Sequence, residues 1–125
     1  MANPMVVNAG LAIISNLVSG LGGTVPKFVA QGTGSTAPVV GNTALGAEVD
    51  TRVSGTVTRI TTTATNDTMQ VVGTQSVGGT EAITEAGLFD AVSTGNMLAR
   101  GTFAALNLIS GDSMTWTWKI AWTGG

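Results

Sequence analysis

The stretch that decides the fold is Ser113-Met114-Thr115-Trp116-Thr117-Trp118-Lys119-Ile120-Ala121-Trp122. Large apolar side chains alternate there with small or polar ones at every step. A strand with this period of two buries one face and exposes the other. Two interpretations follow. In the first, the whole indole row belongs to the core of a β-sandwich. In the second, part of the row packs against a neighbouring subunit, because tryptophan is favoured as an interface anchor. Trp122, near the end of the chain, is the residue expected to do so.

Further strands are predicted upstream of this stretch, because β-favouring runs alternate with glycine, asparagine and aspartate turn signals. Residues 32–46, rich in Gly, Thr, Pro and Ala, read as a loop with one helical turn near Ala44 and Leu45. Turns are expected at Asn66–Asp67, in residues 93–96 and at Gly111–Asp112. The predicted strands are residues 27–31, 53–64, 69–77, 82–89, 97–105 and 113–122.

One helix is predicted, over residues 8–21, with Asn8 as its N-cap and Gly22–Gly23 as its stop. Its opposite face carries small and polar residues and no charge, whereas a solvated helix face normally carries charges. We therefore expect the helix to be covered on more than one side, so that residues 1–21 contribute to a subunit or capsid contact. The candidate interface residues are the apolar stripe at helical spacing together with the last indole: Leu11, Ile14, Leu17, Val18, Leu21 and Trp122.

The chain is therefore expected to be an all-β protein, an antiparallel β-sandwich of about seven or eight strands with one N-terminal α-helix. Its 125 residues divide into an N-terminal helical arm, residues 1–26, and a β-sandwich domain, residues 27–125.

Composition narrows the function classes. Charged residues make up 10% of the chain, against about 25% in an average soluble domain, while Thr (20) and Gly (18) are abundant. This balance indicates that much of the surface lies against other protein. A net charge of −2 with five scattered basic residues argues against nucleic-acid binding. The apolar N-terminus is interrupted by asparagine and serine and lacks a basic start, so we expect neither a signal peptide nor a membrane span.

The same composition argues against an enzyme. The chain has no Cys, His or Tyr, so an enzyme would have to work with acids, lysines and hydroxyls. Residues 32–37 match a loose dinucleotide-binding pattern, but no helix is predicted to follow, so we read a loop. Glu81, Glu85 and Asp90 form the only acidic cluster, and solvated or salt-bridged acids explain it. We predict no catalytic residue, no cofactor and no metal ligand.

Two details of the C-terminal half have a structural explanation. Glu85 is placed to pair with Arg100 across a hairpin, which would fix the register of the two strands. Gly87 is expected to mark a bulge or a close backbone approach. Asn66-Asp67-Thr68 matches a glycosylation sequon, but turn chemistry alone explains an Asn-Asp pair at this position.

The C-terminal half also resembles a known group of proteins. The resemblance lies in Ile83-Thr84-Glu85-Ala86-Gly87-Leu88-Phe89-Asp90-Ala91, in Gly95-Asn96-Met97-Leu98-Ala99-Arg100-Gly101-Thr102-Phe103 and in Ser110-Gly111-Asp112-Ser113 before the tryptophan strand. These segments are similar to those of small structural proteins of tailed-bacteriophage virions. Residues 28–34 and 43–49 also look like that group, so the resemblance covers most of the chain. It carries no catalytic residue.

The resemblance implies a virion component, and two roles stay open. In the first, the protein is a capsid decoration (cement) protein or short head fibre, which binds the major capsid protein and stabilises the shell. In the second, it is a tail-fibre or tail-tip module that contacts the host receptor. Composition favours the first, because the three tryptophans share one strand and no tyrosine is present for a glycan site. We further expect a homo-oligomer, a trimer, located in the virion at the capsid surface or, on the second reading, in the tail.

Overall fold

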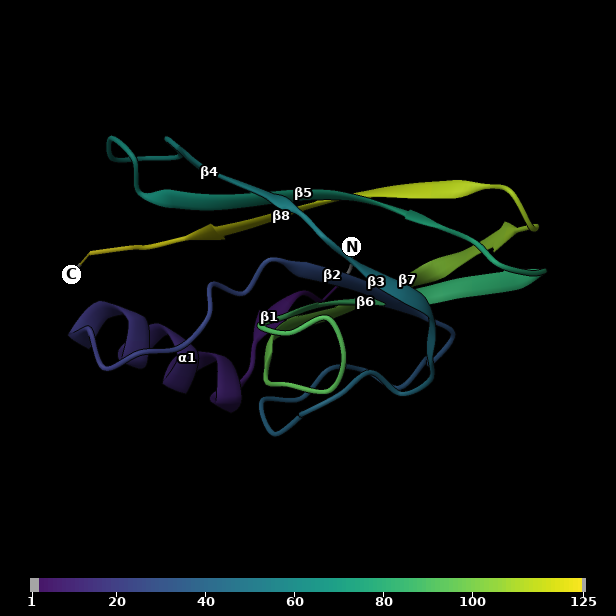
Figure 1. Ribbon diagram of the computed structural model, residues 1–125, viewed down its shortest axis with the longest axis horizontal. Helices are drawn as coiled ribbons and strands as arrows, with labels where there is room; N and C mark the ends of the chain where they lie inside the picture. Colours follow the sequence, from purple (N-terminus) through teal and green to yellow (C-terminus); the bar gives the residue numbers. More distant parts are fainter. Residues whose placement is uncertain (1–2, 125) are drawn as a thin grey trace.

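The computed structural model describes residues 3–124, in which two antiparallel β-sheets pack face to face and one helix covers an end of the sandwich (Figure 1). The helix is α1 (Asn8–Ser19). The predicted antiparallel β-sandwich with one N-terminal helix is confirmed. The five-stranded sheet has the order β1 (Met5–Val6), β7 (Met97–Leu108), β6 (Glu81–Phe89), β2 (Phe28–Gly32) and β3 (Glu48–Ser54), and the three-stranded sheet has the order β4 (Thr56–Ile60), β5 (Thr68–Ser76) and β8 (Ser113–Ala121).

The core lies between the two sheets, and β8 supplies its aromatic part. Trp116, Trp118 and Ile120 are buried and Met114 is half-buried, while the alternate, odd-numbered residues of β8 are exposed. They pack in one cluster with side chains from both sheets, including Val71 of the smaller sheet and Val29 of the larger one. The prediction that the indole row belongs to the core is therefore confirmed for Trp116 and Trp118. Each strand of a sandwich turns one face toward the opposite sheet, and these indoles lie on that face.

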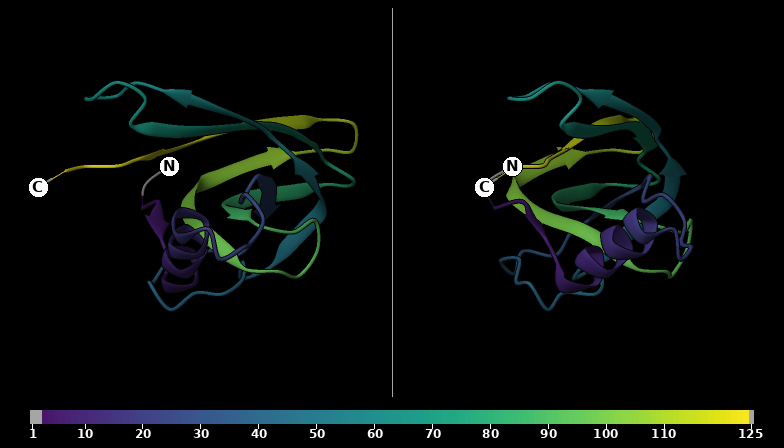
Figure 2. Two further views of the ribbon diagram at one scale, coloured as in Figure 1. Left: turned by 60° about the vertical axis from the view of Figure 1, so that its left-hand side comes forward. Right: turned by 90° about the vertical axis from the view of Figure 1, so that its left-hand side faces the viewer.

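The predicted single strand over residues 53–64 is wrong. The chain instead forms β3 in the larger sheet and β4 in the smaller one, with Gly55 between them, and the ribbon passes from one sheet to the other there (Figure 2). A Cβ on Gly55 would lie 2.5 Å from Cγ1 of Val71, and its N–H donates to the carbonyl of Lys27 at 2.7 Å. The corner therefore requires glycine. The β-favouring residues on both sides concealed this break.

Both ends of the predicted helix need correction. Val7 precedes the helix in extended conformation and provides no side-chain cap, and Asn8 is the first helical residue rather than the N-cap. The helix ends at Ser19 because Gly20 adopts a left-handed conformation, φ +71°, so the stop comes before Gly22 and Gly23.

The remaining predicted elements agree with the structure except in two places. No helical turn forms at Ala44 and Leu45, because Leu45 is instead buried in the second apolar cluster, beside Ala30 and Phe89. The short strand β1 was not predicted; two residues give too little pattern, and pairing with β7 creates it. The remaining predicted strands agree with the observed ones, although β7 continues three residues beyond Ala105.

Helix α1 is held against β7 by a glycine contact. An added Cβ on Gly10 would lie 2.3 Å from the carbonyl oxygen of Leu98, so backbone packs directly on backbone. Alanine inside a helix is normally better than glycine by about 0.5–1 kcal/mol. At Gly10 the clash destabilises the fold by more than this gain in helix propensity.

We expect Gly10→Ala to lower the free energy of unfolding by about 1–3 kcal/mol, the usual range for overpacking. Denaturant unfolding followed by circular dichroism measures it. Gly41→Ala is the matched control, because nothing lies within 4 Å of the new methyl group and its backbone φ is not positive. Equal effects of the two substitutions would contradict the described backbone contact between Gly10 and Leu98.

Candidate interaction surface

The outer face of α1 carries exposed apolar side chains among small polar ones and faces away from the rest of the chain. Only Gly10 and Ile13 of the helix are buried. Val18 is 84% exposed and Leu17 is 37% exposed, whereas Ile14 is half-buried and packs against the main core. The helix has no acidic residue in its first turn and no basic residue in its last. Its exposed surface therefore presents apolar, serine and asparagine side chains without charge.

A cleft connects this helix face to the end of β8. It has a volume of about 90 Å³ and no polar lining. Trp122, which directly follows β8, is 47% exposed and forms one side of the cleft. We call this the α1–β8 cleft; its lining residues are Ile14, Leu17, Val18, Pro26, Met69, Leu98 and Trp122.

The structure brings four of the six predicted interface residues together. Ile14, Leu17, Val18 and Trp122 line the α1–β8 cleft. Leu11 and Leu21 do not line it. Leu11 is 58% exposed on the preceding turn of the helix, and Leu21 is 81% exposed beyond the helix end. Residues 1–2 of the predicted contact region lie outside the described residues. Whether these side chains meet a partner stays a prediction.

The position of Trp122 is fixed by the turn between β4 and β5. Its N–H donates to the carbonyl of Asp67 at 2.9 Å. The Asp67 carboxylate accepts hydrogen bonds from the N–H groups of Thr62, Thr63 and Ala64, each at 2.8 Å. These backbone donors hold the pKa of Asp67 well below its usual value. The predicted Asn66–Asp67 turn is confirmed, with Asn66 at φ +59°.

The second notable group of polar residues is the buried pair Glu85 and Arg100. Both side chains are fully buried, and Nη2 of Arg100 lies 3.0 Å from Oε1 of Glu85. The pairing predicted across the β6–β7 hairpin is confirmed, as a diagonal contact, because Arg100 stands opposite Gly87 in the register.

This pair anchors the long loop between β2 and β3. The Glu85 carboxylate accepts hydrogen bonds from the N–H groups of Gly34, Gly46 and Ala47 at 2.7–2.8 Å. Arg100 donates to the loop on its other side, to the carbonyl of Thr36 and the side-chain oxygen of Asn42. Every oxygen of the carboxylate is occupied by a donor, so Glu85 acts as a structural clamp on a loop that the sequence showed only as irregular.

Gly87, in the same motif, lies in a crowded position. A Cβ on Gly87 would lie 3.0 Å from both Cδ2 of Leu45 and the ring of Phe89, so side chains crowd it. No bulge occurs at Gly87 itself; the ladder shifts on either side, between Ile83 and Glu85 and between Leu88 and Phe89. The prediction of a bulge or a close backbone approach at Gly87 is therefore wrong, because side chains rather than backbone crowd this position.

Sequence reasoning missed Arg52, which fixes the β6–β7 turn. Its guanidinium lies 3.5 Å above the Phe89 ring, pairs bidentately with Glu48 at 2.8–2.9 Å, and donates to the carbonyls of Ala91 and Thr94. The signal available in the sequence was the even spacing of Glu48 and Arg52, which places both on one face of a strand.

The Glu85 clamp predicts acid sensitivity. Burial acts to raise the pKa of Glu85, but the three backbone donors and Arg100 outweigh it, so the pKa lies below its usual value. The stabilisation is therefore present above the unfolded-state pKa, about 4.3, and is lost as pH falls through the lower folded-state pKa. We expect the melting temperature to fall as pH drops below about 4. A melting temperature that stays constant from neutral pH to pH values near 2 would contradict this.

Over residues 3–124, no group of three or more His, Cys, Asp or Glu side chains is placed to hold a metal ion. Within the same range, no helix is long and apolar enough to cross a membrane. Comparisons of the chain with protein-family models, curated proteins and solved structures found no match.

Proposed function

We propose that this protein is a structural component of a tailed-bacteriophage virion, a capsid decoration protein that binds the major capsid protein and stabilises the shell. It performs no chemistry of its own. The observation that carries the proposal is the uncharged apolar surface formed by α1 and Trp122 on a chain of which only 10% is charged.

The resemblance to virion proteins supports the proposal in a second way. Two polar residues of the shared motif are occupied inside the fold, since Glu85 and Arg100 bind each other and the loop. A motif whose polar groups are used internally is consistent with a scaffold whose outer surface carries the function. Permanent assembly would cover the exposed apolar side chains, which an isolated protein leaves in water.

Decoration places the protein on the capsid surface as a partner of the assembled shell. A specific contact of this kind typically buries about 1,200–2,000 Å². The α1–β8 cleft and the exposed helix residues would form the centre of that contact, where apolar and aromatic side chains contribute most of the binding energy.

The alternative role is a tail-fibre or tail-tip module that contacts the host receptor. The resemblance to virion proteins leaves this open. The two roles differ in stoichiometry, so the copy number per particle separates them. We expect purified virions to contain this protein in a number comparable with that of the major capsid protein, measured by quantitative mass spectrometry. A few copies per particle would contradict decoration and support the tail role.

A further inference from the structure

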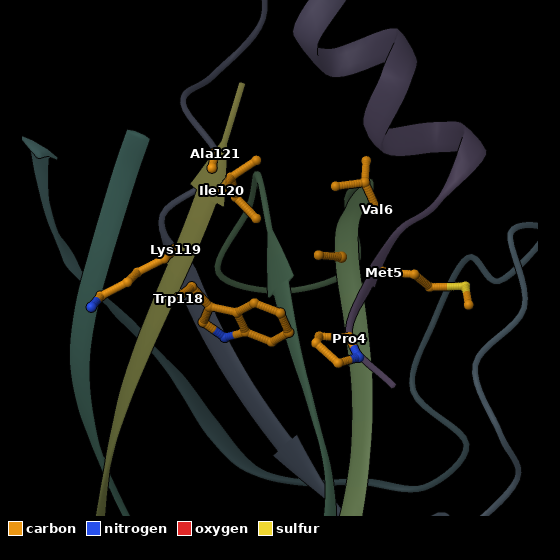
Figure 3. A pocket seen from close by; sticks show the side chains of 8 residues that line it. Pro4, Met5, Val6, Trp118, Lys119, Ile120 and Ala121 are labelled. Carbon is orange, nitrogen blue, oxygen red and sulfur yellow. The ribbon is translucent and has the colours of Figure 1, made fainter. Parts of the chain in front are cut away.

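One side of the sandwich is open. The strand β8 is the outermost strand of the three-stranded sheet, and in the described chain no strand pairs with its second edge. Beside it, the larger sheet ends in β1, which pairs with β7 at only two residues. Between the two edges lies a groove of about 190 Å³, and Figure 3 shows the Trp118 indole reaching across it from β8 toward Pro4. We call this the β1–β8 groove; it is lined by Pro4, Met5, Val6, Ala99, Trp118, Lys119, Ile120 and Ala121.

The hydrogen-bond pattern shows which backbone groups face this open side. Trp122 donates to Asp67, and Val77 donates to Asp112, and both pairs extend the β5–β8 ladder at even-numbered positions of the β8 segment. In an antiparallel ladder, bonded and non-bonded positions alternate. The N–H and C=O groups of the odd-numbered residues therefore point to the free edge: Ser113, Thr115, Thr117, Lys119 and Ala121.

This edge lacks the usual protection against strand pairing. Proteins commonly block exposed edges with proline, bulges, several charges or very short strands. In contrast, β8 pairs with β5 over nine consecutive residues without a register shift, contains no proline, and carries Lys119 as its single charge. It is a long, regular template for another strand.

A buried donor at the same place lacks a partner. The indole of Trp118 is 4% exposed and lines the β1–β8 groove, and its Nε1–H has no hydrogen-bond partner among the described residues. Leaving a buried donor unpaired is unfavourable, because the donor has lost its hydrogen bond to water without gaining another. A strand added beside β8 would bring polar backbone groups to this side of the sandwich.

We propose that a second copy of this chain pairs its own β8 antiparallel with this edge, around a two-fold axis at Thr117. The reason for choosing a second copy is that β8 is complementary to itself. Reversing the strand about Thr117 matches each inward apolar position with another apolar one, Met114 with Ile120 and Trp116 with Trp118. The odd-numbered residues then face each other, so the free N–H and C=O groups of both copies are satisfied together.

The register follows from charge. A two-fold axis at Lys119 would place the two lysines directly opposite each other, which is unfavourable. The axis at Thr117 instead places Lys119 opposite Thr115 of the second copy, and Thr117 opposite its own equivalent, a favourable pair. It also gives the longest overlap. The contact is isologous and closes as a dimer, which differs from the trimer that the sequence led us to expect.

The inference does not depend on the virion role, and the test uses the purified protein alone. Sedimentation equilibrium or light scattering should give the mass of a dimer for the unmodified protein at micromolar concentrations. Thr117→Pro removes a free-edge N–H without touching the β5 ladder, and proline is tolerated at such edges. We expect this variant to be a folded monomer, while Thr117→Ala, which keeps the N–H, stays dimeric. A monomeric or trimeric unmodified protein, or a dimeric Thr117→Pro variant, would overturn the inference.

A second pair of variants tests the register even if Thr117→Pro fails to fold. Thr115 is exposed and would face Lys119 of the second copy. Two such pairs occur in each dimer, so Thr115→Glu should tighten the dimer and Thr115→Lys should weaken it, each by about 2- to 30-fold in Kd. Equal Kd values for the two variants would reject this register.

Discussion

Replacing Glu85 with Gln is expected to lower the free energy of unfolding by about 3–5 kcal/mol at neutral pH, because it leaves the buried guanidinium of Arg100 without its counter-charge. The carboxylate also accepts three backbone hydrogen bonds, and the amide NH2 that replaces one of its oxygens would face N–H donors, so the loop between β2 and β3 would be held less firmly. Chemical denaturation measures the change, and hydrogen exchange at Gly34, Gly46 and Ala47 should increase.

The matched control is Glu81→Gln, which makes the same chemical change on the same strand. Burial and the neighbouring Asp50 raise the pKa of Glu81 above its usual value. A raised pKa means that folding disfavours the ionised form, and any stabilising contribution is lost as pH rises. Glu81→Gln should therefore leave stability at neutral pH equal or slightly higher. A similar decrease in the free energy of unfolding for the two variants would show that the buried Glu85–Arg100 pair is not the source of the stabilisation.

Replacing Val18 with Lys is expected to weaken binding to virus particles by roughly 30-fold or more, provided that the proposed capsid contact uses the α1–β8 cleft. A charge placed in the centre of an apolar contact removes at least about 2 kcal/mol, as hot-spot substitutions do. The fold should tolerate the change, because Val18 is exposed and a cation near the C-terminal end of a helix is favourable. Cosedimentation with particles that lack the protein measures the affinity.

Ser15→Lys provides the comparison for that variant. It adds the same charge to the same helix at an exposed position outside the α1–β8 cleft. We expect the Ser15→Lys protein to bind particles within a few-fold of the unmodified protein. If both variants lose binding equally, the contact depends on net charge rather than on this apolar surface.

The sequence predicted those parts of the fold in which the local pattern and the tertiary environment agree. The alternation of β8 predicted its buried indoles because one strand face meets the opposite sheet. It could not predict the corner at Gly55, where the residues on both sides favour strand and only the approach of Val71 requires glycine. Likewise, the packing of α1 on β7 depends on the contact between Gly10 and Leu98, which no local pattern reveals.

The candidate surface was predictable to a similar extent. An apolar stripe with an uncharged opposite face indicated a helix with a partner, and Ile14, Leu17, Val18 and Trp122 do meet at one cleft. The stripe did not show which residues pack inward, because Gly10 and Ile13, rather than Leu11, are buried. The sequence also could not predict that β8 has an open edge, since the order of strands in a sheet is set by tertiary structure.

The most direct measurement is the temperature at which particles release their genome, compared between complete particles, particles lacking this protein, and depleted particles with the purified protein added back. Because a decoration protein binds only the assembled shell, it should stabilise that shell by mass action. We predict a lower release temperature for depleted particles, and recovery on addition that grows with concentration until the sites are filled. Equal release temperatures in all three samples, together with lost adsorption of depleted particles to host cells, would contradict decoration.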